Sequence, residues 1–155
     1  VATGAGKTII TATLAHCAEK YGRTITIVPN KDLVTQTEED FLNVGLDVGV
    51  YFGDRKMIGH QHTICTWQSL NVLDKKSKNW DLEEALSLAE FLHGVTTVIV
   101  DEVHMAKADA LKTLLTSVFA HVPIRWGLTG TIPKEQFEQM SIWQFIKFKI
   151  KCFVQ

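Results

Sequence analysis

Short runs of apolar and β-branched residues recur along the chain, and each has the length of a buried strand. The five runs are Thr24–Val28, Val48–Tyr51, Thr63–Thr66, Val95–Val100 and Ile124–Leu128. Stretches with a helical pattern accompany them, and these are Lys7–Lys20, Lys31–Leu42, Leu82–Leu92 and Ala108–Phe119. Strands that alternate with helices form parallel sheets covered on both faces, so the pattern predicts a doubly wound α/β domain.

Three segments lack this pattern. Asp74–Asp81 (DKKSKNWD) is polar and charged, which predicts an exposed loop, and Gly53–His62 is expected to be a connection rich in glycine and histidine. The last segment, Ser141–Gln155, combines aromatic and β-branched residues with three lysines. We expect it to pack on the sheet as a terminal helix or strand, and a basic, aromatic surface that stacks nucleic-acid bases is the alternative.

Composition fits one domain of ordinary size, because 155 residues with 46% hydrophobic content can bury one core. The formal net charge of -1 gives no global positive field, so any nucleic-acid contact would be local. Cys17, Cys65 and Cys152 are too far apart for a CxxC motif and favour a reducing cytosol. The sequence has no run of about 18 apolar residues, the length that would span a membrane. A chain that starts without Met is expected to be a piece of something longer.

The clearest chemical signal is the segment ATGAGKT near the start of the chain. Gly4 and Gly6 let the backbone turn so that its N–H groups point inward, and the following helix adds its dipole at the phosphates. Lys7 would neutralise the β- and γ-phosphates of ATP, and the Thr8 hydroxyl would bind Mg²⁺. Val1 stands where the strict pattern has glycine, and an ordinary glycine-rich turn is the competing interpretation. The predicted ATP-binding residues are Thr3, Gly4, Ala5, Gly6, Lys7 and Thr8.

An acidic pair follows the apolar run that ends at Val100. Asp101 would hold Mg²⁺ directly or through water, and Glu102 would orient and deprotonate the water that attacks the γ-phosphate. His104 would lie near the γ-phosphate, where a hydrogen bond to a neighbouring loop could report the nucleotide state. A solvated acidic loop is the alternative for an isolated pair, and the phosphate-binding segment upstream favours the joint ATP-site interpretation.

Together these segments resemble superfamily 2 helicases of the DExH type. GAGKT resembles motif I, Val28–Gln36 resembles motif Ia, and DEVH resembles motif II. TWQSL at Thr66–Leu70 resembles the motif that follows Ia, and LTGT at Leu128–Thr131 resembles motif III. The five motifs stand in the family's order over Val1–Pro133. Their combination is most similar to phage UvsW-type helicases and to related repair and restriction motors.

The resemblance implies a RecA-like P-loop NTPase fold with a parallel sheet and helices on both faces, and an ATP-dependent helicase or translocase that uses ATP and Mg²⁺. The residues implied in catalysis are Lys7, Asp101, Glu102 and His104, with Thr8 and Asp101 at the metal ion. The residues implied to bond the sugar-phosphate backbone without reading bases are Pro29, Thr35, Gln36, Thr66, Gln68 and Ser69. The residues implied to couple hydrolysis to movement between lobes are Thr129, Gly130 and Thr131.

The resemblance further implies a nucleic-acid partner, with DNA repair or recombination favoured, in the cytoplasm of a bacterium or a phage-infected host. It assigns residues 1–140 to a first RecA-like lobe and residues 141–155 to a divergent tail. The second RecA-like lobe, the expected partner of this one, lies outside the sequence together with its motif VI arginines. Because an arginine finger contributes about 10³ to 10⁵ in rate, the isolated lobe is expected to hydrolyse ATP poorly.

Two other classes of function stay open. The chain could be a catalytically silent nucleotide-binding scaffold, or a P-loop NTPase outside the helicases, such as a kinase, in which TWQSL and LTGT have no role. Single residues also have structural interpretations. Pro29 and Asn30 suit a turn and a helix cap, and Trp67 is expected either to pack or to be exposed for stacking.

Overall fold

The computed structural model describes residues 5–79, 88–101, 113–114 and 116–128, and of residues 5–8 it describes the backbone. Within this part of the chain lies a six-stranded sheet in the order β3-β2-β4-β1-β5-β6. The strands are β1 (Arg23–Val28), β2 (Val48–Phe52), β3 (Arg55–Lys56), β4 (His62–Thr66), β5 (Val95–Asp101) and β6 (Ile124–Leu128). The pair β2–β3 is antiparallel, and the other neighbouring pairs are parallel.

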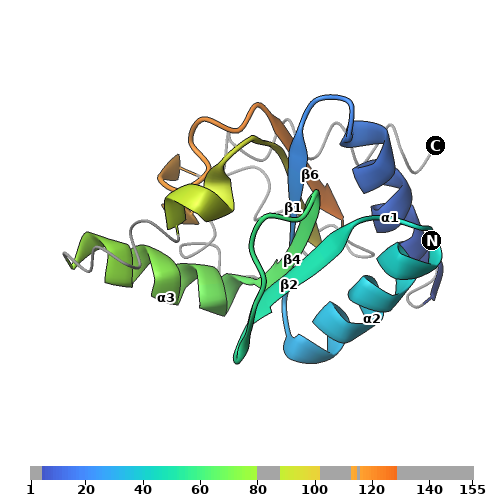
Figure 1. Ribbon diagram of the computed structural model, residues 1–155, viewed down its shortest axis with the longest axis horizontal. Coiled ribbons are helices and arrows are strands. Elements are labelled where there is room, and N and C mark those ends of the chain that lie inside the picture. Colours follow the sequence, from blue (N-terminus) through green and yellow to red (C-terminus); the bar gives the residue numbers. More distant parts are fainter. Residues whose placement is uncertain (1–4, 80–87, 102–112, 115, 129–155) are drawn as a thin grey trace, which may run out of the picture.

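Helices cover both faces of this sheet. Figure 1 shows α1 (Ala5–Ala18) and α2 (Lys31–Asn43) on one side and α3 (Trp67–Lys78) on the other. Residues 88–92 are also helical. The central strands are buried along almost their whole length, as expected for parallel strands between two helical layers. The predicted α/β fold with helices on both faces is therefore confirmed.

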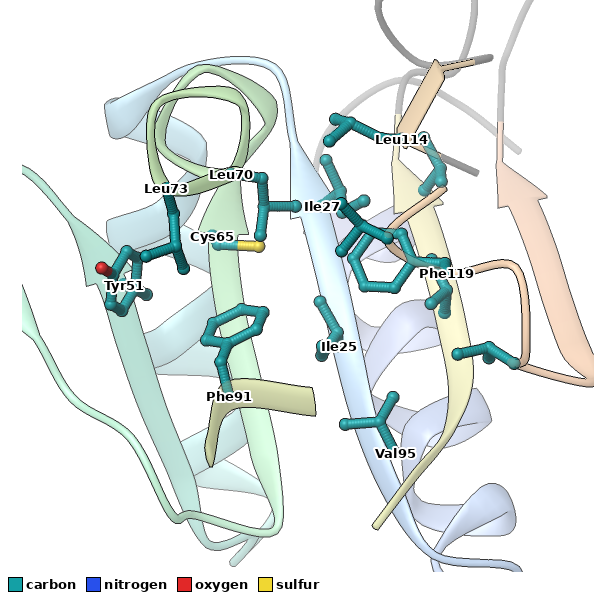
Figure 2. Close-up of a cluster of buried hydrophobic side chains, with 14 residues drawn as sticks. Ile25, Ile27, Tyr51, Cys65, Leu70, Leu73, Phe91, Val95, Leu114 and Phe119 are labelled. Carbon is teal, nitrogen blue, oxygen red and sulfur yellow. The ribbon is translucent and has the colours of Figure 1, made fainter. Parts of the chain in front are cut away.

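Each face has its own hydrophobic core. Under α1 and α2, Ala12 and Ala15 pack with Val28 and Ile99. On the opposite face, Leu70 and Leu73 of α3 pack against strand residues, and Figure 2 shows their side chains directed at the sheet beside Cys65 and Tyr51.

The prediction of an exposed loop at Asp74–Asp81 is wrong for residues 74–78, because α3 continues to Lys78. Leu70 and Leu73 lie three residues apart and turn one face of the helix to the core, so the lysines that follow occupy the solvent face. Asp74 is itself buried and accepts a hydrogen bond from Lys78 at 2.8 Å. The polar composition that suggested a loop therefore belongs to an amphipathic helix.

Other elements agree with the expected pattern or extend it. The connection at Gly53–His62 contains the short strand β3. Of the two remaining predicted helices, residues 88–92, 113, 114 and 116 are described as helical, and residues 117–119 form a turn. Asn30 caps α2, since its Oδ1 accepts a hydrogen bond from the N–H of Leu33 at 3.0 Å. Trp67 is half-buried against the core, which confirms its packing interpretation. No helix among the described residues is long and apolar enough to cross a membrane.

Candidate nucleotide-binding and nucleic-acid site

Four parallel strands end side by side at one edge of the sheet. The register pairs Val28 with Thr66 across β1 and β4, and it pairs Asp101 with Leu128 across β5 and β6. Because Ile27 pairs with Val100, the ends of β1 and β5 are level as well. We call the side of the sheet formed by the C-terminal ends of its parallel strands the carboxyl edge, and the opposite side the amino edge. Open α/β sheets bind their ligands at the carboxyl edge.

Helix α1 points its N-terminus at this same edge. Its other end lies at the amino edge, where Glu19 bonds to the His62 ring at 2.7 Å and Arg23 N donates to Gly94 O at 2.9 Å. The 14-residue helix is about 21 Å long, close to the roughly 23 Å of β5, so it spans the sheet from one edge to the other. The backbone of residues 5–8 forms the first turn of α1, and a helix N-terminus presents free N–H groups and a positive dipole end to an anion.

Asp101 ends β5 on the side of the sheet that α1 covers. Side chains alternate along a strand, so Asp101 faces the same way as Ile99, which packs in one cluster with Ala12 and Ala15 of α1. The Asp101 side chain is only 4% exposed and has an interaction partner within the fold. A buried carboxylate at the end of a strand beside a helix N-terminus is a suitable ligand for a hard divalent cation.

Several predicted site residues lie outside the described part of the chain. They are Thr3, Gly4, Glu102, His104, Thr129, Gly130 and Thr131, together with the side chains of Ala5, Gly6, Lys7 and Thr8. Their predicted roles in ATP binding, catalysis and coupling stay predictions.

The two segments predicted to bind a nucleic-acid backbone meet at the carboxyl edge. Gln68 is exposed in the first turn of α3, and its Nε2 donates to the carbonyl of Pro29 at 3.4 Å. Thr66 is buried and caps α3, because its Oγ1 accepts from Ser69 N at 3.2 Å and bonds to Ser69 Oγ at 2.9 Å. Thr66 and Gln68 therefore both have partners within the fold, and Gln68 is the exposed residue of the two.

Thr35 and Gln36 lie on the solvent side of α2, which starts just after β1. Their polar groups make long hydrogen bonds within the helix, Thr35 to Lys31 O and Gln36 to Asp40, both at 3.4 Å. Bonds of this length are weak, so both side chains can exchange them for a phosphate oxygen.

A groove between α3 and the β2–β3 hairpin adds two basic residues that the sequence did not single out, Lys56 and Lys76. They lie 20 positions apart in the chain, and only the packing of α3 beside the hairpin brings them to one surface. No motif or spacing in the sequence signals this neighbourhood.

Two histidines near the amino edge have partners in the fold. His62 is fully buried and bonds to Thr24 and Glu19, and His60 bonds to Asp47 at 2.7 Å. Burial lowers the pKa of His62, and its bond to Glu19 opposes that shift. Burial also raises the pKa of the Cys65 thiol. Among the described residues, no three histidine, cysteine or acidic side chains are grouped to hold a metal ion.

Residues 1–134 match the family described as type III restriction enzyme, res subunit. The chain belongs to this family. The match covers the ATGAGKT segment, the six strands of the described part of the chain and the pair Asp101–Glu102. The predicted assignment to the N-terminal lobe of a superfamily 2 helicase is thereby confirmed.

One curated protein and two solved structures are similar to the res-family chain. A Halobacterium salinarum protein named as a DNA 3'-5' helicase, Rad25, is 26% identical over 147 residues, covering 92% of this chain and 22% of that protein. The UvsW helicase of bacteriophage T4 superposes with a TM-score of 0.64 at 20% identity, covering 87% of this chain and 46% of that one. The Sulfolobus solfataricus SWI2/SNF2 ATPase core, solved with dsDNA, gives a TM-score of 0.53 at 22% identity, covering 94% and 29%.

The solved structures show that the fold is that of RecA-like helicase cores. The chain spans less than half the length of each of these proteins and about a fifth of the curated relative.

Proposed function

We propose that this lobe binds ATP with Mg²⁺ at the carboxyl edge of the sheet and grips one nucleic-acid strand by its backbone, as part of an ATP-driven motor. One observation carries the proposal: α1 begins at the edge where β1, β4, β5 and β6 end level with one another. That arrangement brings the first turn of α1, the buried Asp101 and the exposed Gln68 to one edge of the sheet, which supports the proposal.

For the nucleotide, the proposal assigns each group a separate task. The N–H groups of the first turn of α1 and the ammonium of Lys7 would hold the β- and γ-phosphates. Thr8 and Asp101 would supply oxygen ligands to Mg²⁺, which prefers oxygen donors and neutralises phosphate charge when bound. Glu102, the next residue after β5, would orient and deprotonate the attacking water.

For the track, exposed polar side chains beside this edge would bond phosphate oxygens. Gln68 and the helical start of α3 lie at the end of β4, next to Pro29 at the end of β1. Such contacts fix position without reading bases, so binding should be independent of sequence. We favour DNA, in repair or recombination, because a DNA helicase and a dsDNA-bound core are among the similar proteins.

Replacing Lys7 with alanine tests the nucleotide part of the proposal directly. A charge-assisted contact to phosphate stabilises binding by about 1.5–3 kcal/mol, so Lys7→Ala should weaken binding of a fluorescent ATP analogue with Mg²⁺ by roughly ten- to a hundredfold. Asp101→Asn should instead reduce the dependence of binding on Mg²⁺. The readout is a fluorescence titration of the full-length protein.

Lys20→Ala is the matched control, because Lys20 is exposed just beyond the opposite end of α1. Equal affinity in the Lys7 and Lys20 variants would show that the nucleotide is not held at the start of α1.

A further inference from the structure

A groove of about 250 Å³ runs between α3 and the β2–β3 hairpin. Lys56 of β3 and Lys76 of α3 line it from its two sides. Gln68 and Ser69, from the first turn of α3, line the part nearest the end of β4. The groove therefore opens beside the contacts already proposed for the nucleic-acid backbone and continues away from them along the hairpin.

Strand pairing explains why Lys56 faces the groove. Neighbouring residues on a strand point to opposite faces, and Arg55 points to the α2 side, where it makes two hydrogen bonds to Glu38 at 2.8 and 2.9 Å. Lys56 points to the α3 side, and its ammonium lies 5.7 Å from the centre of the Tyr51 ring. None of the described residues that line the groove is acidic.

The floor of the groove is formed by buried side chains. Tyr51 and Leu73, which are 3% and 2% exposed, lie side by side in the core beneath it (Figure 2). A cleft of one sign of charge over a low-dielectric wall concentrates the field and attracts a counter-ion more strongly than an open surface does. The lysine charge should therefore act on an anion inside the groove.

The volume limits what the groove can take. Sites for whole small molecules measure about 300–1,000 Å³, so a groove of about 250 Å³ suits a single phosphate group with its water better than a nucleotide. An apolar ligand would leave the Lys56 ammonium and the Gln68 amide at the rim without polar partners from the ligand.

We propose that this groove binds a backbone phosphate of the nucleic-acid track, with Lys56, Gln68 and Ser69 as its ligands and Lys76 adding to the positive field. The inference rests on the proposed function, since it extends the same track from the ends of β1 and β4 towards the β2–β3 hairpin. The contact reads charge and shape, so it is the same for any base sequence.

Lys56→Gln tests the groove in the full-length protein. The measurement is fluorescence anisotropy with a labelled single-stranded DNA of mixed sequence, titrated at several salt concentrations. The slope of log K against log salt is negative, and losing one phosphate contact should reduce its magnitude by about 1 and weaken binding about two- to fivefold. Lys56→Arg should keep both values near those of the wild type, and Lys75→Gln, on α3 but outside the groove, should change neither.

Val72 supplies a second, independent test at the rim. It is 51% exposed, so a polar residue there is compatible with folding. Val72→Glu puts a negative charge into the groove and should weaken DNA binding. Val72→Gln introduces a side chain of nearly the same shape as glutamate but without the charge, and it should leave binding unchanged.

The outcomes separate the two proposals. If the wild type binds DNA while Lys56→Gln and Val72→Glu bind as tightly as their controls, the groove is not a phosphate site and the proposed function stands. If the wild type binds no nucleic acid at any salt concentration but still binds the ATP analogue, both the track and the groove are overturned.

Discussion

Two buried ionisable side chains mark opposite edges of the sheet. Asp101 ends β5 at the carboxyl edge, on the side where α1 begins, and His62 starts β4 at the amino edge, near the end of α1. Burying either group is costly without partners. His62 bonds to Thr24 and Glu19, which ties α1 to two central strands and thereby fixes the helix whose other end faces Asp101.

The burial of His62 makes stability depend on pH. Burial lowers its pKa below the ordinary 6.5, Glu19 and Asp47 oppose the shift, and His16 adds to it. The unfolded chain therefore binds a proton at higher pH than the folded chain does. The free energy of unfolding should be greatest above about pH 6.5 and should fall as the pH drops through 6.5, until the folded-state pKa is reached.

Urea unfolding between about pH 8 and about pH 5 measures this dependence. His62→Gln should remove this part of the slope, while His93→Gln, at an exposed histidine, should leave it unchanged. A slope that survives in His62→Gln would assign the pH dependence to other groups.

Among the elements, the connection from α1 to β1 sets how β1 lies against β5. Gly22 has φ +149, and a Cβ there would come within 2.7 Å of the Gly94 carbonyl oxygen and 2.8 Å of the Thr96 side chain. The register between β1 and β5 also shifts at this point, between Arg23 and Thr24. This close approach places the two strands so that their far ends are level at the site.

Gly22→Ala should therefore be strongly destabilising, by about 3 kcal/mol or more, since backbone strain and a clash with backbone both contribute. Gly45→Ala is the matched control. Gly45 also has positive φ (+86) but open space around it, so that change should cost only about 1–2 kcal/mol. Chemical denaturation of both variants gives the comparison, and equal losses would show that the Gly22 contact is unimportant.

Hydrophobic runs predict the long strands well, because buried parallel strands carry apolar residues on both faces. The observed bounds of these five strands differ from the predicted ones by at most one residue. The polar stretch after Leu73 misled the prediction, since its lysines form the solvent face of α3 rather than a loop. The two-residue strand β3 is too short to have a pattern of its own.

The candidate site was predictable in part for a similar reason. Motif order locates the strand ends that carry Asp101 and Gln68, because parallel strands bring their carboxyl ends to one edge. The position of Lys56 and Lys76 on one groove depends on packing between elements distant in sequence. A single sequence contains no direct signal of such neighbours.

In the molecule as a whole, the proposed function assigns different tasks to the two faces of the sheet. The α1 side holds the proposed nucleotide site, and the α3 side holds the groove that extends the proposed track. The proposed nucleotide site and the groove both lie beside the carboxyl edge. The proposed phosphate site is therefore only a few strands away from the proposed nucleic-acid contacts. Under the proposed function, this proximity would give a short physical route from ATP hydrolysis to movement on the track.

The most direct test is ATP hydrolysis by the full-length protein, with and without single- and double-stranded DNA and RNA, beside Lys7→Ala and Glu102→Gln. Turnover should rise with nucleic acid, and Glu102→Gln should lower it by about 10² to 10⁴, as expected for loss of a general base. Lys7→Ala should abolish it as well. Turnover that is indifferent to every nucleic acid, or that survives in both variants, would contradict the motor assignment.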